Sequence, residues 1–84
     1  MNSKHRQALQ AIFSDPVSGN IEWRRIESLL GALGCELVEG RGSRVTFVKG
    51  ELKASFHRPH PGKEALKYRV MAVRNFLELL EAKP

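Results

Sequence analysis

The chain has 84 residues, of which 42% are hydrophobic and 27% are charged. This length allows one domain with a modest core and excludes a large two-lobed enzyme, and the composition excludes a wholly disordered chain. The formal net charge of +5 is concentrated, because residues 41–74 hold nine Lys or Arg against two Glu, a net +7. Such localisation is typical of a surface that binds a phosphate backbone, although a solvated surface of mixed charge gives the same count.

Cysteine content and hydropathy exclude further classes of protein. Cys35 is the only cysteine, so it cannot form an internal disulfide, and its apolar neighbours predict a buried thiol. No Cys/His set has the spacing of a zinc site, and we expect neither a metal nor another cofactor. No apolar run approaches the roughly 20 residues of a membrane span, and the N-terminus MNSKHRQ lacks a secretory apolar region. These features predict a cytoplasmic protein with no membrane partner.

The first third of the chain predicts two helices. The segment Ser3–Phe13 has an apolar side at helical spacing, with Ser3 as its expected N-cap. Residues 14–20 contain Pro, Gly, Asn, Asp and Ser and predict a loop. A second helix is expected from about Ile21 or Glu22 to Leu33, with Gly34 as the residue that ends it.

Three strands and a last helix follow. Alternating apolar residues predict strands over 35–39, 44–48 and 51–57, joined by the short turns 40–43 and 49–50. From Lys63 the apolar spacing changes to helical, which predicts a helix from about Lys63 to Ala82 with Leu66 on its buried side. The order predicts an α+β sandwich of two layers: residues 21–84 form an α-β-β-β-α domain, and residues 1–20 are an N-terminal helical extension.

Period-two alternation also predicts a polar face of the sheet. If Leu52, Ala54 and Phe56 face the helices, then Lys53, Ser55 and His57 face the opposite side. Arg44 and Thr46 share that outer face on the preceding strand. The face is therefore basic and rich in hydroxyl groups, which suits either solvent or a nucleic acid.

The turn after the third strand reads FHRPHPGKEALKYRV, and its prolines exclude helix before Pro61. The pattern places a turn with two histidines at a helix N-terminus, where free backbone N–H groups favour an anion. Lys63, Lys67 and Arg74 recur at helical spacing and predict a basic stripe along the last helix.

Three motifs occur in a fixed order: LGCELV at the end of the second helix, GRGSRVTF at the first hairpin, and PHPGKEALKYRV before the last helix. Together with the α-β-β-β-α order, they resemble the HicA family of bacterial toxins over about residues 22–80. The resemblance implies a fold like that of double-stranded-RNA-binding domains. It also implies an mRNA interferase that inhibits translation and growth, with a HicB-type antitoxin protein as partner.

The family resemblance further implies a catalytic histidine directly after the hairpin Gly-Ser. In this chain the position after Gly42-Ser43 is Arg44, which binds phosphate but cannot shuttle a proton near neutral pH. His57 and His60 are the remaining candidates for catalysis. His57 is favoured because it lies on the predicted basic face. Each position also has a purely structural explanation: His57 as an exposed histidine at a strand end, and His60 as a histidine that packs on the turn.

Two functions remain open from the sequence. The first is a metal-independent endoribonuclease that uses a histidine to move the proton, and the second is an RNA-binding module that no longer cleaves. Both predict a set of RNA-binding residues: Arg41, Ser43, Arg44, Lys53, Arg58, Lys63 and Lys67. A helix-turn-helix that binds DNA fits less well, because strands separate the two main helices.

Overall fold

The computed structural model describes residues 1–84 and has the predicted order of elements. The elements are α1 (Ser3–Ile12), α2 (Trp23–Ala32), β1 (Glu36–Glu39), β2 (Arg44–Lys49), β3 (Leu52–His57) and α3 (Lys67–Leu79). The strands form one antiparallel sheet in the order β1-β2-β3. The predicted α+β fold class, α-β-β-β-α with an extra N-terminal helix, is confirmed.

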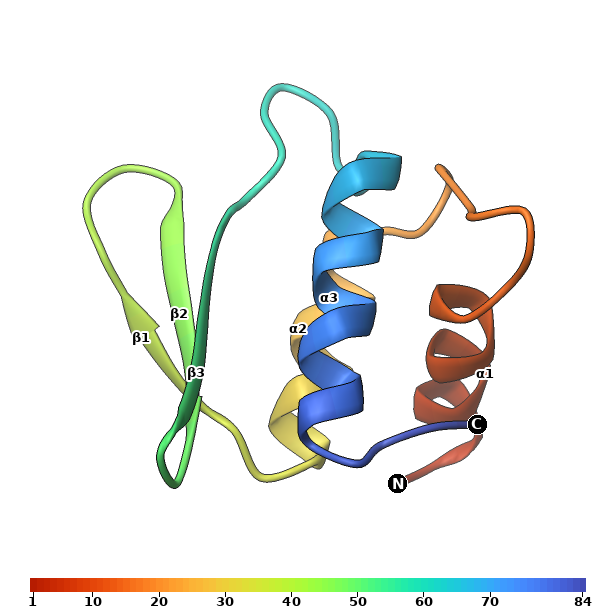
Figure 1. Ribbon diagram of the computed structural model, residues 1–84. Helices are drawn as coiled ribbons and strands as arrows, with labels where there is room; N and C mark the ends of the chain where they lie inside the picture. Colours follow the sequence, from red (N-terminus) through yellow and green to blue (C-terminus); the bar gives the residue numbers. More distant parts are fainter.

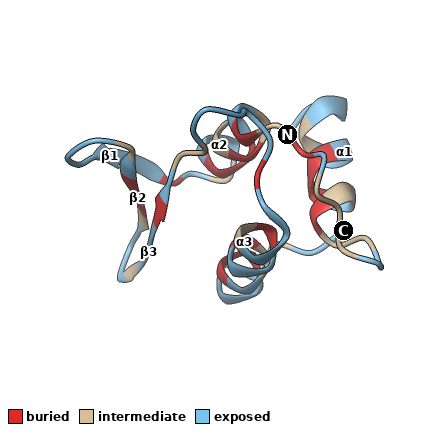
Figure 2. Ribbon diagram, turned by 90° about the horizontal axis from the view of Figure 1, so that it is seen from above, coloured by how far each residue is buried: buried red, intermediate tan, exposed pale blue.

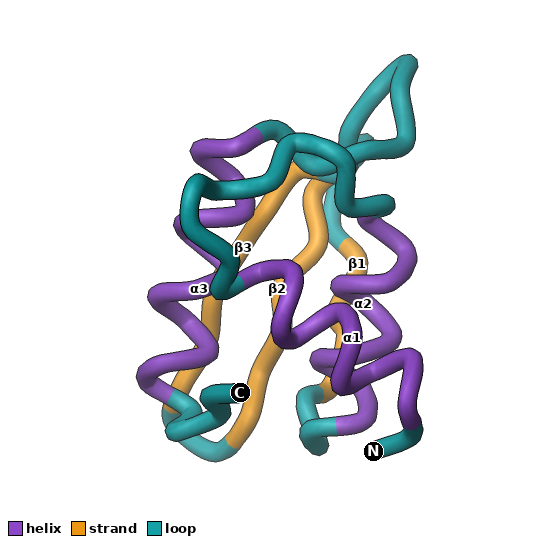
Figure 3. Tube along the Cα trace, turned by 90° about the vertical axis from the view of Figure 1, so that its right-hand side faces the viewer, coloured by secondary structure: helices purple, strands orange, loops and turns teal.

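The helices all lie on one side of the sheet (Figure 1). α2 and α3 cover the sheet, and α1 packs on both of them from the side away from the strands. Figure 3 shows this arrangement from the α1 side, with helices in front of the strands. The N-terminal helix therefore adds a third layer, and the opposite face of the sheet has no layer over it.

One hydrophobic core holds the three layers together. Figure 2 shows in red the buried segments of the strands and of the three helices. The sheet contributes Val45, Phe47 and Phe56, because these side chains alternate toward the helices. α1 contributes Ala8, Leu9 and Ile12, which belong to the same cluster as the residues of α2 and α3. The N-terminal extension is thus packed into the domain.

The start of α1 differs from the prediction by one residue. Asn2, and not Ser3, is the N-cap. Its side-chain oxygen accepts the N–H of His5 at 2.9 Å, and Nδ1 of His5 accepts the N–H of Asn2 at 3.3 Å. This reciprocal capping satisfies two of the free donors at the helix N-terminus. Gly34 has φ +93° and ends α2 as predicted, since this left-handed conformation favours glycine.

The last helix begins at Lys67, four residues later than predicted. The segment before it is extended and pairs with the segment that precedes α2: Trp23 N–H donates to Lys63 O and Ala65 N–H to Ile21 O, both at 2.8 Å. This pairing holds residues 63–65 out of the helix, and it leaves Leu66 57% exposed where a buried position was predicted. The predicted helix N-terminus at the Pro/Gly turn is therefore wrong, and so is the anion site inferred from it.

The predicted end of α3 at Ala82 is also wrong, because the helix ends at Leu79. Glu81 has φ +59°, and a left-handed residue cannot continue a right-handed helix. None of the three helices has the length and apolar character needed to cross a membrane.

Candidate nucleic-acid interface

The outer face of the sheet carries the predicted polar residues. On β2, buried Val45 and Phe47 alternate with less buried residues, and on β3 buried Phe56 lies between the exposed Ser55 and His57. The Oγ1 of Thr46 and the Oγ of Ser55 are 2.7 Å apart across the two strands. This contact confirms that Thr46 and Ser55 share the outer face, because only residues on the same face of paired strands can meet in this way.

Arg44 and His57 are directly opposite each other at one end of this face. Arg58 N–H donates to Ser43 O at 2.8 Å, so the pair that follows along the ladder, Arg44 with His57, lacks such hydrogen bonds. In antiparallel sheets a pair of this kind brings the Cα atoms to about 4.5 Å and the side chains closest together. The guanidinium and the imidazole therefore start from neighbouring points on one face.

A third polar group belongs to the same end of the sheet. The Oγ of Ser43 lies 3.3 Å from Nδ1 of His57. A serine hydroxyl can donate to this nitrogen or accept from it, so the contact orients the ring in either tautomer. The Nε2 atom, on the far side of the ring, remains for a ligand. The structure thus brings together Ser43, Arg44 and His57, three of the predicted site residues.

Arg69 holds the end of β3 in place, a contact that the sequence did not indicate. Its Nη1 donates to the backbone oxygen of His57 at 2.6 Å, and its Nη2 donates to the hydroxyl of Tyr68 at 2.7 Å. The guanidinium carbon also lies 5.1 Å from the centre of the Tyr68 ring. The first turn of α3 is therefore linked to the strand end that carries the imidazole.

Arg58, predicted to bind RNA, binds two carboxylates of the protein. Its Nε donates to Glu27 on α2 and its Nη1 to Glu39 on β1, each at 2.7 Å. Glu27 also accepts a hydrogen bond from the indole of Trp23. The hydrogen bonds to these two carboxylates, with their charges, raise the pKa of Arg58. The charge of the guanidinium is thus already neutralised. These contacts also link Arg58, the residue directly after β3, to α2.

The remaining predicted residues are exposed at separate places. Arg41 lies in the β1–β2 loop and His60 in the Pro/Gly turn, at the same end of the molecule (Figure 1). Lys53 shares the outer face but pairs with Val48, four residues from His57 along β3 and hence about 13 Å away. Lys67 opens α3. The structure does not bring these four side chains together with the Arg44–His57 pair.

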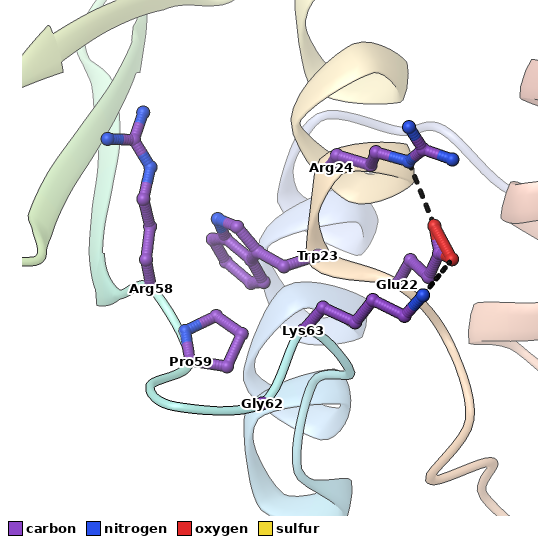
Figure 4. A pocket seen from close by; sticks show the side chains of 7 residues that line it. All are labelled: Glu22, Trp23, Arg24, Arg58, Pro59, Gly62 and Lys63. Atoms are coloured by element: carbon purple, nitrogen blue, oxygen red, sulfur yellow. Dashed lines mark hydrogen bonds and ion pairs between the residues drawn. The ribbon is translucent and has the colours of Figure 1, made fainter.

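Lys63 lines an open hollow of about 370 Å³ between the start of α2 and the Pro/Gly turn (Figure 4). Glu22 lies between two cations there: its carboxylate is 2.8 Å from Nε of Arg24 and 3.5 Å from Nζ of Lys63. The hydrogen bond and charge of Arg24, with a smaller contribution from Lys63, lower the pKa of Glu22. A carboxylate therefore occupies the position that an anionic ligand would take.

The predicted basic stripe on α3 is wrong in two respects. Lys63 is not helical, and Arg74 points toward α1, where it caps the end of that helix. Its Nε and Nη2 donate to Ile12 O at 3.0 and 2.7 Å, and Nη2 also donates to Ser14 O at 3.0 Å. The guanidinium carbon lies 5.5 Å from the centre of the Phe13 ring. Arg74 thus satisfies free carbonyls at a helix C-terminus.

Cys35 is a buried free thiol, as its apolar neighbours predict. Burial raises its pKa, although the charge of Lys49 acts in the opposite direction. A protonated thiol is a poor nucleophile, so Cys35 is not part of the site.

Comparison with known proteins places these features in a family. The model of the family described as HicA toxin of bacterial toxin-antitoxin matches residues 23–81. No curated protein matches the chain. No solved structure matches it either. The family match covers well over half of the chain, from the first residue of α2 to two residues after α3. The chain therefore belongs to the HicA family of toxins from bacterial toxin–antitoxin systems.

Proposed function

We propose that the protein acts in the bacterial cytoplasm as the toxin of its system, binds mRNA on the outer face of the sheet and cleaves it. A HicB-type antitoxin neutralises it. The observation that carries the proposal is the pair formed by Arg44 and His57, with Ser43 on the imidazole ring. A phosphate-binding cation beside a group that can move a proton is what cleavage of an RNA backbone requires.

The proposed reaction uses the RNA's own 2′-hydroxyl as nucleophile. Nε2 of His57 removes the proton as the 2′-oxygen attacks the adjacent phosphorus. The bond from phosphorus to the 5′-oxygen breaks, and that oxygen takes a proton from solvent water. The products are a 2′,3′-cyclic phosphate and a free 5′-hydroxyl. Arg44 stabilises the charge that develops on the phosphate oxygens.

The purified protein with a 5′-labelled RNA tests this proposal. We expect fragments that end in a cyclic phosphate, formed equally well in the presence of a metal chelator, because no step uses a metal. Binding is measured on the same RNA by fluorescence polarisation. An RNA that is neither bound nor cut by the folded protein would overturn the proposal.

A second function, RNA binding without cleavage, is favoured by one observation. Arg44 stands where the family resemblance implies a catalytic histidine, and arginine is not a proton shuttle near neutral pH. The variant Arg44→His separates the two functions. If the wild type only binds RNA and Arg44→His cuts it, the protein is a binder that has lost its shuttle; if the wild type cuts, His57 remains the proposed shuttle.

Lys63, four residues before α3, and Lys67, the first residue of α3, give a salt-dependence test. We expect the double variant Lys63→Ala, Lys67→Ala to lower the slope of log affinity against log salt by roughly 1 to 2 units, because one or two phosphate contacts are lost. The matched control is Arg6→Ala with Lys83→Ala, which removes two exposed cations elsewhere. Equal slopes for the two double variants would show that Lys63 and Lys67 do not meet the RNA backbone.

Glu22 gives a prediction of opposite sign. We expect Glu22→Gln to raise RNA affinity by about threefold to tenfold, because the change releases Arg24 and Lys63 from a competing carboxylate. The control is Glu64→Gln, an exposed neighbour that removes the same charge without breaking an ion pair. An equal gain in both variants would mean that only the overall charge matters.

A further inference from the structure

A second hollow, of about 500 Å³, lies between the N-terminal helix and α2. It is lined by Lys4, His5, Gln7, Arg24, Arg25 and Ser28, with no carboxylate and no apolar residue among them. α1 supplies half of this lining, and α1 lies outside the segment that matches the family. The hollow is therefore an addition of the N-terminal extension to the family's domain.

His5 makes a side-chain contact between α1 and α2. Nδ1 of His5 accepts the N–H of Asn2, so in the neutral ring the proton is on Nε2. Nε2 lies 2.9 Å from the Oγ of Ser28 and donates to it. The hydroxyl hydrogen of Ser28 is then free to donate into the hollow. The contact between α1 and α2 thus fixes two polar groups in the wall of the hollow, the imidazole of His5 and the hydroxyl of Ser28.

The cations of this hollow continue those of the hollow in Figure 4. Arg24 lines both, and it uses only Nε to hold Glu22, so its two terminal nitrogens remain available. The first hollow also includes Arg58 and Pro59, the residues that directly follow His57 on β3. Cations therefore extend from the end of the outer face of the sheet, past Lys63 and Arg24, to Arg25 and Lys4, with Glu22 between Lys63 and Arg24 and with Arg58 already paired to Glu27 and Glu39. Several cations in a row suit a chain of phosphates better than a single ion.

We propose that the hollow between α1 and α2 is a second contact site for the RNA backbone, which lengthens the stretch of RNA that the toxin holds. The inference rests on the proposed RNA binding at the outer face. The contact is made by cations and hydroxyl or amide donors, so it adds affinity without base specificity. An acidic segment of a partner protein is the other anion of extended shape, and the experiment below separates it from RNA.

The test compares Lys4→Gln, Arg25→Gln with the single variant Arg6→Gln. Arg6 is an exposed cation on the same helix that does not line the hollow. Binding of labelled single-stranded RNAs of about 6 and about 24 nucleotides is measured at several salt concentrations. For the longer RNA we expect the double variant to bind about tenfold more weakly, with a salt slope lower by roughly 1 to 2 units. The shorter RNA, which covers only the outer face, should bind all three proteins alike.

Any of four results would overturn the inference. If the double variant and Arg6→Gln bind the longer RNA equally well, and circular dichroism shows that both are folded, the hollow is not an RNA contact. Polyglutamate stands for an acidic protein segment in this test. If the double variant loses polyglutamate binding and keeps RNA binding, the hollow binds an acidic protein and not RNA. Arg44→Gln distinguishes the two proposals: if it weakens both RNAs while the double variant weakens neither, only the second site fails. A wild type that binds neither RNA would remove both.

Discussion

Replacement of His57 by alanine should abolish RNA cleavage and leave RNA affinity within a few-fold of the wild type. The imidazole is the proposed proton-moving group, opposite Arg44 in the sheet, and loss of a positioned general base or acid lowers rates by about 10² to 10⁴. Binding depends mainly on cations that this change leaves in place. The measurement is the single-turnover cleavage rate together with the dissociation constant on one RNA.

Two further variants test the roles of His60 and Ser43. His60→Ala should slow cleavage less than His57→Ala, because His60 is exposed in the Pro/Gly turn, away from the Arg44–His57 pair. Ser43→Ala removes the contact to Nδ1 and should slow cleavage modestly without changing affinity. Cleavage that survives in both histidine variants would show that neither histidine is the proton shuttle.

Replacement of Ile12 by alanine should lower the free energy of unfolding by about 2–5 kcal/mol, as expected for a large buried aliphatic residue. Ile12 is 0% exposed, and its backbone oxygen accepts two hydrogen bonds from Arg74 on α3. The loss is large for a domain whose total stability is of the order of 5–15 kcal/mol. Urea denaturation measures the change in the free energy of unfolding. A large effect is expected even though Ile12 lies outside the segment that matches the family.

The control for this prediction is Gln10→Ala, at an exposed position of the same helix. It should change the free energy of unfolding by less than about 0.5 kcal/mol, as exposed substitutions usually do. If Ile12→Ala were as mild as Gln10→Ala, then α1 would be an appendage, and the hollow between α1 and α2 would not be a fixed site.

Much of the fold could be predicted because its signals are local. The alternation of Leu52, Ala54 and Phe56 identified the covered face of β3, and hence placed His57 on the open one. Gly34 ended α2 because a left-handed conformation is needed there. Turn lengths fixed the antiparallel order of the strands. Each of these inferences used residues close together in the chain.

The errors arise from contacts between residues far apart in the chain. The start of α3 was misplaced because residues 63–65 pair with residues 21–23, which no local pattern reveals. The charge count was misleading for the same reason. Of the nine cations in residues 41–74, five contact acceptors within the protein: Lys49, Arg58, Lys63, Arg69 and Arg74. A count of charge treats all nine as free, so it overstates the surface available to RNA.

Induced expression of the chain in a bacterial host, without and with a HicB-type antitoxin, tests whether the protein is a toxin that cleaves mRNA. Host growth and the integrity of mRNA are followed after induction. We expect that growth stops and mRNA is fragmented when the protein is expressed alone, that His57→Ala allows growth, and that the antitoxin restores it. Unimpaired growth with intact mRNA, at full expression of folded protein, would contradict this expectation.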